Sequence, residues 1–281
     1  GFSSTIQNPT ISNIQTNQSG TYSVTVTSST GCTGTGSVSV TVNPVPVVTV
    51  TATPNPVCSG GTLSLGTIAG ASYLWSGPNG FSSTIQNPTI SNIQTNQSGT
   101  YSVTVTSSAG CTGTGSVSVT VNPLPSPTAS VTPNPVCTGN KVQFTASGGL
   151  SYAWSGPDGF SSNKQNPGRF ISSVSQGGTY TVTVTNAEGC SNTTTVNLVV
   201  NETPNGTISA TPNPICEGST LQLSATGGLS YLWSGPQGFT STLQNPVINN
   251  FQYNQSGIYQ VVISNNNGCT QTLTIKVEGL R

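Results

Sequence analysis

The side chains best suited to chemistry in this sequence are its seven cysteines, which recur at a constant interval of 79 residues. They form one set of three and one set of four: Cys58, Cys137 and Cys216, and Cys32, Cys111, Cys190 and Cys269. Thiols in such a pattern are typical of disulfides formed in an oxidising compartment. The chain has no histidine, and its sulfurs do not come in closely spaced pairs. We therefore predict disulfide chemistry, with no metal and no other cofactor.

Catalysis is not expected, because the titratable groups that it requires are scarce. An enzyme holds acidic, basic or nucleophilic groups together in one pocket. Charged residues make up only 4% of this chain, compared with about 25% in ordinary proteins. Five acidic side chains balance five basic ones, which disfavours a nucleic-acid partner because such partners require a basic face. No apolar run approaches the roughly 18 residues that indicate a membrane span.

The same 79-residue interval organises the whole chain into repeats. The tryptophans follow it as well, at Trp75, Trp154 and Trp233. A fixed internal period indicates tandem structural units. We predict an incomplete repeat one at residues 1–43, which is the C-terminal half of a unit, and complete repeats two, three and four at residues 44–122, 123–201 and 202–281.

Within repeat two, alternating Val, Ser and Thr residues predict about seven short strands and no helix. The clearest strands are expected at residues 47–51, 62–65, 72–75, 100–106 and 115–121, with short edge strands near 84–85 and 89–90. In the strand at 100–106, Tyr101, Val103 and Val105 should face the core. This pattern predicts an all-β protein of tandem immunoglobulin-like β-sandwich repeats.

Aromatic residues sharpen that prediction. A tryptophan on the third strand and a tyrosine at the start of the sixth are features of immunoglobulin-like domains. We expect core packing for Trp75, Trp154 and Trp233, and tyrosine corners at Tyr22, Tyr101, Tyr180 and Tyr259. The phenylalanines after the third strand, Phe81, Phe160 and Phe239, should anchor their loops on the core. If they were exposed instead, they could stack on sugars and form a glycan contact.

Three sequence blocks of repeat two resemble the immunoglobulin-like or PKD-like repeats of very large Bacteroidota surface proteins, including gliding adhesins exported by the type 9 pathway. The blocks are PVCSGG at residues 56–61, YLWSGPNGF at 73–81, and GTYSVTV at 99–105 with Gly110-Cys111 after it. The resemblance implies an extracellular, cell-surface location. Such repeats also occur as spacers in secreted enzymes.

The cysteines depart from the antibody pattern, because Val103 stands where the second bridging cysteine of an antibody domain would fall. We expect three bridges within repeats and an unpaired Cys32, the pairs being Cys58 with Cys111, Cys137 with Cys190, and Cys216 with Cys269. However, the turns that carry these cysteines lie at opposite ends of a plain immunoglobulin sandwich, and bridged Cα atoms must lie within about 7 Å. Either the first strand is displaced, or the bridge joins neighbouring repeats, as Cys58 with Cys190 would.

All ten charged residues lie in repeats three and four. One local cluster, Asp158, Lys164 and Arg169 in repeat three, is distinctive. We expect these three to be solvated loop charges rather than a binding site.

Short, mostly proline-rich linkers at residues 43–46, 122–127 and 201–206 predict stiff joints, so that the repeats would form an elongated rod. We therefore expect an extracellular structural or adhesive stalk or filament, a segment of a longer surface protein without enzymatic activity. A glycan-binding module, or a spacer of a secreted enzyme, is the alternative. The expected partners are upstream and downstream repeats of the same chain; lateral copies in a fibre and a surface polysaccharide are further candidates.

Overall fold

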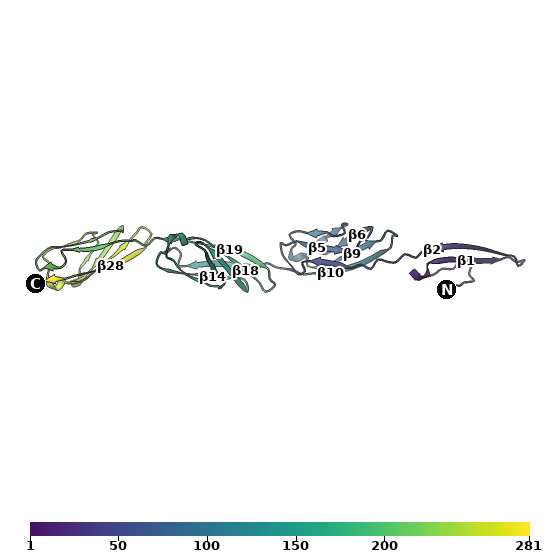
Figure 1. Ribbon diagram of the computed structural model, residues 1–281, viewed down its shortest axis with the longest axis horizontal. Helices are drawn as coiled ribbons and strands as arrows, with labels where there is room; N and C mark the ends of the chain where they lie inside the picture. Colours follow the sequence, from purple (N-terminus) through teal and green to yellow (C-terminus); the bar gives the residue numbers. More distant parts are fainter. The chain divides into compact units, whose positions relative to one another are not determined.

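The computed structural model describes all 281 residues, and its regular structure is almost entirely β (Figure 1). The chain divides into two compact units, Gly1–Leu124 and Pro125–Arg281. Repeats two, three and four each enclose a separate hydrophobic core. The protein is thus a tandem array of immunoglobulin-like β-sandwich repeats. No helix has the length and apolar character needed to cross a membrane.

Each complete repeat contains two antiparallel sheets and one short parallel ladder. In repeat two, the first sheet has the order β3 (Val50–Thr53), β5 (Leu63–Thr67) and β8 (Thr89–Ile90). The second has the order β10 (Thr112–Val119), β9 (Gly99–Thr106), β6 (Ser72–Ser76) and β7 (Ser82–Ser83). The ladder pairs β4 (Val57–Cys58) with β11 (Val121–Asn122) in parallel.

Repeats three and four have the same arrangement. The sheets of repeat three are β12 (Thr128–Thr132), β14 (Lys141–Ser147) and β17 (Gly168–Phe170), and β16 (Phe160–Ser162), β15 (Ser151–Gly156), β18 (Gly178–Thr185) and β19 (Ser191–Leu198), with the ladder β13 (Val136–Cys137) and β20 (Val200–Asn201). Those of repeat four are β21 (Ile208–Thr211), β23 (Leu221–Ala225) and β26 (Val247–Ile248), and β25 (Thr240–Ser241), β24 (Ser230–Ser234), β27 (Gly257–Ser264) and β28 (Thr270–Val277), with the ladder β22 (Ile215–Cys216) and β29 (Gly279–Leu280).

A proline-rich turn carries the first strand from one sheet to the ladder. In repeat two this turn is Thr53-Pro54-Asn55-Pro56, with both X-Pro bonds in the cis form. The Asn55 amide Nδ2 donates to the Ser118 carbonyl at 2.7 Å, and the Thr120 backbone amide donates to Asn55 Oδ1 at 3.1 Å. These bonds hold the turn against the last strand, so the cysteine that follows lies beside the C-terminal end of its own repeat.

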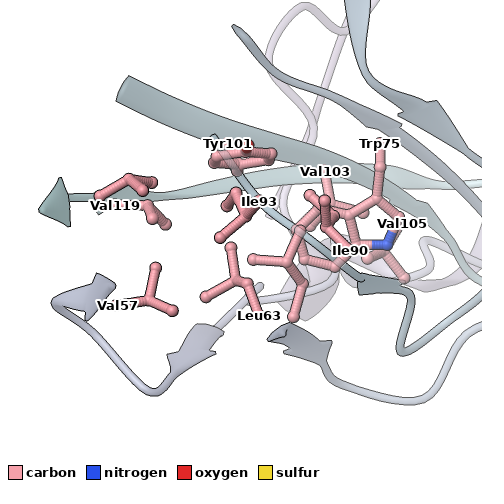
Figure 2. Packing of buried hydrophobic residues seen from close by; sticks show 11 residues of the cluster. Val57, Leu63, Trp75, Ile90, Ile93, Tyr101, Val103, Val105 and Val119 are labelled. Carbon is pink, nitrogen blue, oxygen red and sulfur yellow. The ribbon is translucent and has the colours of Figure 1, made fainter. Parts of the chain in front are cut away.

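The core of repeat two is built from alternate residues of its strands (Figure 2). Tyr101, Val103 and Val105 of β9 are all buried, as the alternation predicts. Trp75 is fully buried, and its indole Nε1 donates to the Ile85 carbonyl at 3.0 Å. The Tyr101 hydroxyl donates to the Gln97 carbonyl at 2.9 Å. That bond to the backbone four residues upstream is the tyrosine corner of immunoglobulin-like domains.

The other tyrosines at this position make the same bond. The distances to the carbonyl four residues upstream are 2.8 Å for Tyr22, 2.7 Å for Tyr180 and 3.0 Å for Tyr259. Trp154, Trp233, Tyr180 and Tyr259 are buried, whereas Tyr22 is only half-buried.

The expectation of no helix was wrong in detail. Four single 3₁₀ turns precede the corner strands, at η1 (Thr16–Gln18), η3 (Thr95–Gln97), η4 (Val174–Gln176) and η6 (Tyr253–Gln255), and two more follow the third strand, at η2 (Pro78–Gly80) and η5 (Pro236–Gly238). At the start of η3 the Gln94 backbone amide donates to Gln97 Oε1 at 2.8 Å. A three-residue turn is too short to produce a helical period in the sequence.

Repeat one consists of a single hairpin, β1 (Gly20–Thr27) paired with β2 (Thr33–Val40), preceded by η1. Its sequence matches residues 80–122 except for Thr30 against Ala109. The side chains nevertheless lie in different surroundings, since Val24 is 57% exposed and its counterpart Val103 is 1% exposed. In repeat two, the strands from 44–79 cover this face.

This pair of valines allows a matched test of burial. Val103→Ala should lower the free energy of unfolding of repeat two by about 2–3 kcal/mol, because it removes two buried methyl groups and leaves a cavity. Val24→Ala should change stability by less than about 0.5 kcal/mol. Denaturant unfolding followed by far-ultraviolet circular dichroism measures both, and equal effects would contradict the burial difference.

Candidate functional site

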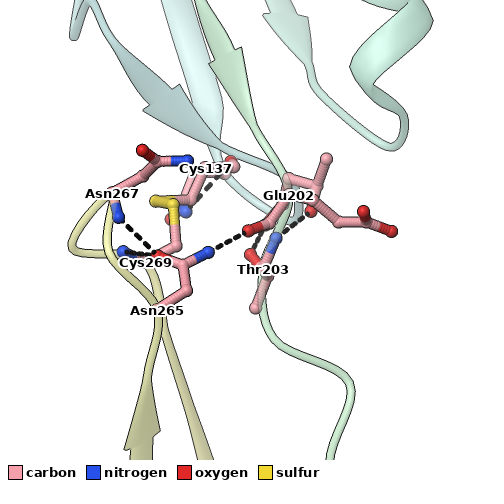
Figure 3. The surroundings of a disulfide bond; sticks show 8 residues. Cys137, Glu202, Thr203, Asn265, Asn267 and Cys269 are labelled. Carbon is pink, nitrogen blue, oxygen red and sulfur yellow. Dashed lines mark hydrogen bonds between the residues drawn. A yellow bond between two sulfur atoms is a disulfide. The ribbon is translucent and has the colours of Figure 1, made fainter. Parts of the chain in front are cut away.

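The candidate site is a disulfide surrounded by hydrogen bonds, and it lies within Pro125–Arg281, where repeats three and four meet. Cys137 at the end of β13 and Cys269 after β27 form a disulfide with a Cα–Cα distance of 5.7 Å (Figure 3). The two residues are 132 positions apart in the sequence. The bridge therefore joins two consecutive repeats.

The position of Cys137 follows from the parallel ladder. Val136 pairs with Val200, and Cys137 pairs with Asn201, the last residue of repeat three. The proline-rich turn before β13 thus brings the first cysteine of the repeat to the linker that leads into repeat four.

The position of Cys269 follows from the tight turn between β27 and β28. The Asn265 backbone amide donates to the Cys269 carbonyl at 3.1 Å, and the Cys269 amide donates to Asn265 Oδ1 at 3.0 Å. Gly268 has a φ of 78°, a conformation that favours glycine. Cys269 is fully buried in the resulting junction.

Hydrogen bonds fix the linker between the two halves of this site. The Asn265 amide Nδ2 donates to the Glu202 carbonyl at 2.7 Å (Figure 3). On the other side, the Thr203 amide donates to Thr138 Oγ1 at 2.9 Å, and the Thr203 hydroxyl donates to the Thr138 carbonyl at 2.6 Å. The linker is thus bonded to the repeat before it and to the repeat after it.

The expected bridges within single repeats are corrected by this geometry. Cys137 bonds to Cys269 rather than to Cys190, and Cys111 and Cys216 are free thiols, so the pairs Cys58 with Cys111, Cys137 with Cys190 and Cys216 with Cys269 do not form. Cys58 and Cys190 are disulfide-bonded, and Cys32 is free and exposed.

The physical reason is that the two cysteines of one repeat lie at its opposite ends. In repeat three, Cys137 lies beside Asn201 at the C-terminal linker. The turn with Cys190 lies near the N-terminal linker, where the neighbouring Asn192 donates from Nδ2 to the Pro125 carbonyl at 3.1 Å. A bridge between neighbouring repeats, the alternative left open by the sequence, is the one that Cys137 makes.

The three phenylalanines after the third strand lie against the corner tyrosines. Each pair of rings is in an edge-to-face arrangement. The distances between ring centroids are 5.4 Å for Phe81 and Tyr101, 5.3 Å for Phe160 and Tyr180, and 5.5 Å for Phe239 and Tyr259. All three pack on the core of their repeat as partly buried side chains. This position is the loop anchor, and it leaves the aromatic rings engaged with the protein itself.

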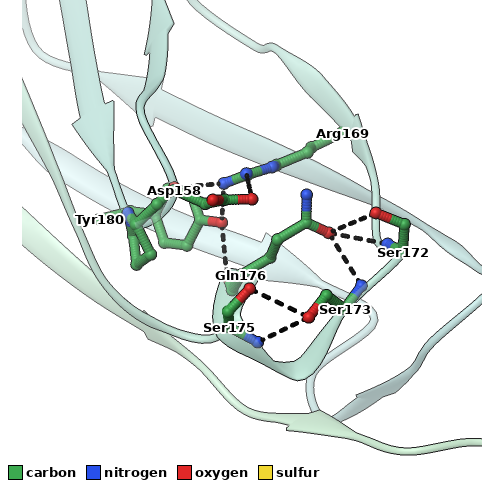
Figure 4. Close-up of polar contacts among 8 residues, drawn as sticks. Asp158, Arg169, Ser172, Ser173, Ser175, Gln176 and Tyr180 are labelled. Carbon is green, nitrogen blue, oxygen red and sulfur yellow. Dashed lines mark hydrogen bonds and ion pairs between the residues drawn. The ribbon is translucent and has the colours of Figure 1, made fainter.

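A second polar cluster surrounds Tyr180 in repeat three (Figure 4). Arg169 Nη1 donates to the Tyr180 hydroxyl at 2.6 Å and to the Pro157 carbonyl at 2.9 Å. The guanidinium also lies 5.1 Å from the ring centroid of Phe160 and 3.8 Å from the Asp158 carboxylate. Burial raises the pKa of Tyr180, and the neighbouring Arg169 opposes this rise.

The sequence predicts that Asp158, Lys164 and Arg169 are all solvated loop charges, but the structure separates them. The Arg169 side chain is only 10% exposed and donates a hydrogen bond to the hydroxyl of the corner residue Tyr180. The Asp158 side chain is 55% exposed. Lys164 is exposed as well. No pattern in the sequence marks Arg169 as the buried member, because its partners come from two other segments, the loop at residues 157–160 and the strand that carries Tyr180.

This difference predicts unequal effects of two substitutions. Arg169→Ala should lower the free energy of unfolding by about 2 kcal/mol, because charge-assisted hydrogen bonds and aromatic contacts are lost. Asp158→Asn should cost less than about 1 kcal/mol, since its ion pair is long and exposed, and repeat two already carries Asn79 at the equivalent positive-φ position. Unfolding followed by Trp154 fluorescence compares the two, and a larger loss for Asp158→Asn would contradict the assignment.

The paired sheets, the buried tryptophan and the tyrosine corner define the class of this protein: an immunoglobulin-like sandwich in tandem copies. The PKD domain family model matches residues 127–200, which cover most of repeat three. No curated protein matches the chain.

Several solved structures are similar at low identity. The three N-terminal domains of the bacteriophage RB49 outer capsid protein Hoc are 12% identical, with 83% of this chain and 99% of that chain covered and a TM-score of 0.33. The full ectodomain of mouse nectin-like molecule 4 is 17% identical, with 80% and 97% covered and a TM-score of 0.32. A structure from a 1.5-MDa bacterial ice-binding adhesin is 16% identical, with 84% and 99% covered and a TM-score of 0.30.

Proposed function

We propose that this chain is an extracellular structural or adhesive stalk or filament segment, in which tandem immunoglobulin-like repeats supply reach. The observation that carries the proposal is the junction of repeats three and four, where the Cys137–Cys269 disulfide and the linker hydrogen bonds restrict how one repeat can move against the next. A protein that serves as a spacer requires such joints. Disulfides also fit an extracellular compartment.

The composition supports a structural role as well. The few charged side chains are spread over repeats three and four, and no three His, Cys, Asp or Glu residues lie together where they could hold a metal ion. The sequence resemblance to repeats of Bacteroidota surface adhesins, including type 9 secretion substrates of gliding cells, supports a place in a cell-surface protein. Neighbouring repeats are the partners that this role requires.

A glycan-binding module is the less favoured alternative. It would need exposed aromatic rings, and Phe81, Phe160 and Phe239 pack instead on the corner tyrosines and cores. The polar clusters around Arg169 and around the junction disulfide are satisfied by the protein's own groups.

Small-angle scattering of the purified chain tests the stalk proposal. At roughly 30–40 Å per repeat from strand lengths, the three complete repeats should extend over roughly 90–120 Å. The radius of gyration should lie well above the about 19 Å of a compact domain of this length. A Cys137→Ser/Cys269→Ser variant should give a broader distance distribution, because the joint is released. A compact particle, or identical curves for both proteins, would contradict the proposal.

A further inference from the structure

The bridge between Cys137 and Cys269 defines a rule that can be applied to every cysteine. It joins the cysteine that precedes the second strand of one repeat (Cys137, before β14) to the cysteine that follows the sixth strand of the next (Cys269, between β27 and β28), 132 residues later. Four cysteines have a counterpart at this separation in the sequence: Cys58, Cys137, Cys190 and Cys269. These four are disulfide-bonded, and the three without a counterpart, Cys32, Cys111 and Cys216, are free.

We propose that Cys216 and Cys111 are covalent docking points for further repeats of this same type. Cys216 would bond to the cysteine after the sixth strand of a following repeat. Cys111 would bond to the cysteine before the second strand of a preceding repeat. The partner at each point is thus a complementary end of this repeat, recognised by the same junction contacts that surround Cys137 and Cys269.

The surroundings of Cys216 match those of Cys137. Ile215 pairs with Gly279 and Cys216 pairs with Leu280 in a parallel ladder, just as Cys137 pairs with Asn201. The Glu217 amide donates to the Leu280 carbonyl at 2.9 Å, the same distance as from the Thr138 amide to the Asn201 carbonyl. Cys216 is exposed in this position. Repeat four therefore presents the receiving half of the junction without its partner turn.

The surroundings of Cys111 match the other half of the junction. The Cys111 amide donates to Ser107 Oγ at 3.2 Å, as the Cys269 amide does to Asn265. The Cys111 thiol lies 3.8 Å from the Asn43 carbonyl. Asn43 stands at the repeat position of Asn201, the residue that pairs with Cys137. The Cys111 sulfur is therefore held beside the strand end where a pre-strand cysteine lies in repeat three.

Bond formation is ordinary thiol–disulfide exchange with a small disulfide donor such as oxidised glutathione. The Cys216 thiolate attacks the donor, which releases one glutathione thiol and leaves a mixed disulfide. The incoming cysteine thiolate then displaces the second glutathione. Two protein thiols lose two electrons and two protons, and one donor disulfide becomes two thiols.

The test is an extended chain in which a second copy of residues 202–281 follows Arg281. After folding with reduced and oxidised glutathione, free thiols are alkylated and disulfide-linked peptides are identified by mass spectrometry without reduction. In the 281-residue chain Cys216 should be alkylated. In the extended chain its alkylation should fall by at least about tenfold, and its peptide should be linked to the copied Cys269. The Cys137–Cys269 peptide serves as the internal control for folding.

The matched control is the extended chain with Cys269→Ser in the appended copy only, in which Cys216 should remain alkylated. Persistent alkylation of Cys216 with the copied cysteine intact would overturn the proposal. A link from Cys216 to the original Cys269, or spread over Cys32 and Cys111, would do the same. This result is independent of the stalk proposal, because a compact chain in scattering experiments would leave the bond partners unchanged.

Discussion

Replacing Cys137 and Cys269 together with serine is expected to lower the free energy of unfolding of Pro125–Arg281 by about 5 kcal/mol. The bridge closes a loop between residues 132 positions apart, and a cross-link of that span removes about this much chain entropy from the unfolded state. Equilibrium unfolding in denaturant, followed by circular dichroism and tryptophan fluorescence, measures the change.

The cooperativity of unfolding should change in the same variant. With the bridge intact, repeats three and four constrain each other through the disulfide and the bonded linker. Without it, we expect the unfolding of repeats three and four to split into two transitions. Cys216→Ser is the matched control, because it makes the same substitution at the equivalent, exposed position of repeat four. Equal stability of the double variant and this control would show that the bridge does not contribute.

Trp233→Ala is expected to destabilise repeat four by about 3–5 kcal/mol, the range for truncating a large buried side chain. Trp233 is fully buried in the core, and its indole Nε1 donates to the Leu243 carbonyl at 3.0 Å. The substitution leaves a large cavity and an unpaired carbonyl. Because the fluorophore of repeat four is lost, circular dichroism and calorimetry measure its unfolding, while Trp75 and Trp154 report on repeats two and three.

The adjacent residue supplies the control for this experiment. Leu232 lies on the same strand, β24, but faces outward and is 56% exposed. Leu232→Ala should change stability by less than about 0.5 kcal/mol. A comparable loss for both variants would mean that strand formation, rather than core packing, is the sensitive property at this site.

The sequence was informative wherever a local pattern determines the structure. The two-residue alternation in Tyr101, Val103 and Val105 predicted which side chains are buried, because successive residues of a strand face opposite sides. The strand ends were less accurate: the first strand of repeat two was expected at residues 47–51 and is observed at Val50–Thr53. Val47, which follows the linker at residues 43–46, is 85% exposed. Residue type alone does not indicate where pairing with a neighbour begins.

The difference between the two copies of one sequence makes the same point. Val24 and Val103 stand in nearly identical stretches, yet one is exposed and the other is buried. Burial depends on the strands that cover the face, and these come from elsewhere in the chain. Arg169 is a similar case, since its contacts with Pro157 and Tyr180 join segments that are separate in sequence.

The cysteines are the most distinctive residues of the sequence. The sequence determined some of their properties, and the tertiary structure decided the others. Their 79-residue interval predicted repeats and disulfide chemistry directly. Their partners were decided by the tertiary structure, because a bridge requires two Cα atoms within a few ångströms. The proline-rich turn takes Cys137 to the end of repeat three that meets repeat four, and the turn after β27 brings Cys269 to the same place. Spacing along the chain cannot show which ends of neighbouring repeats meet, and folding in three dimensions brings them together.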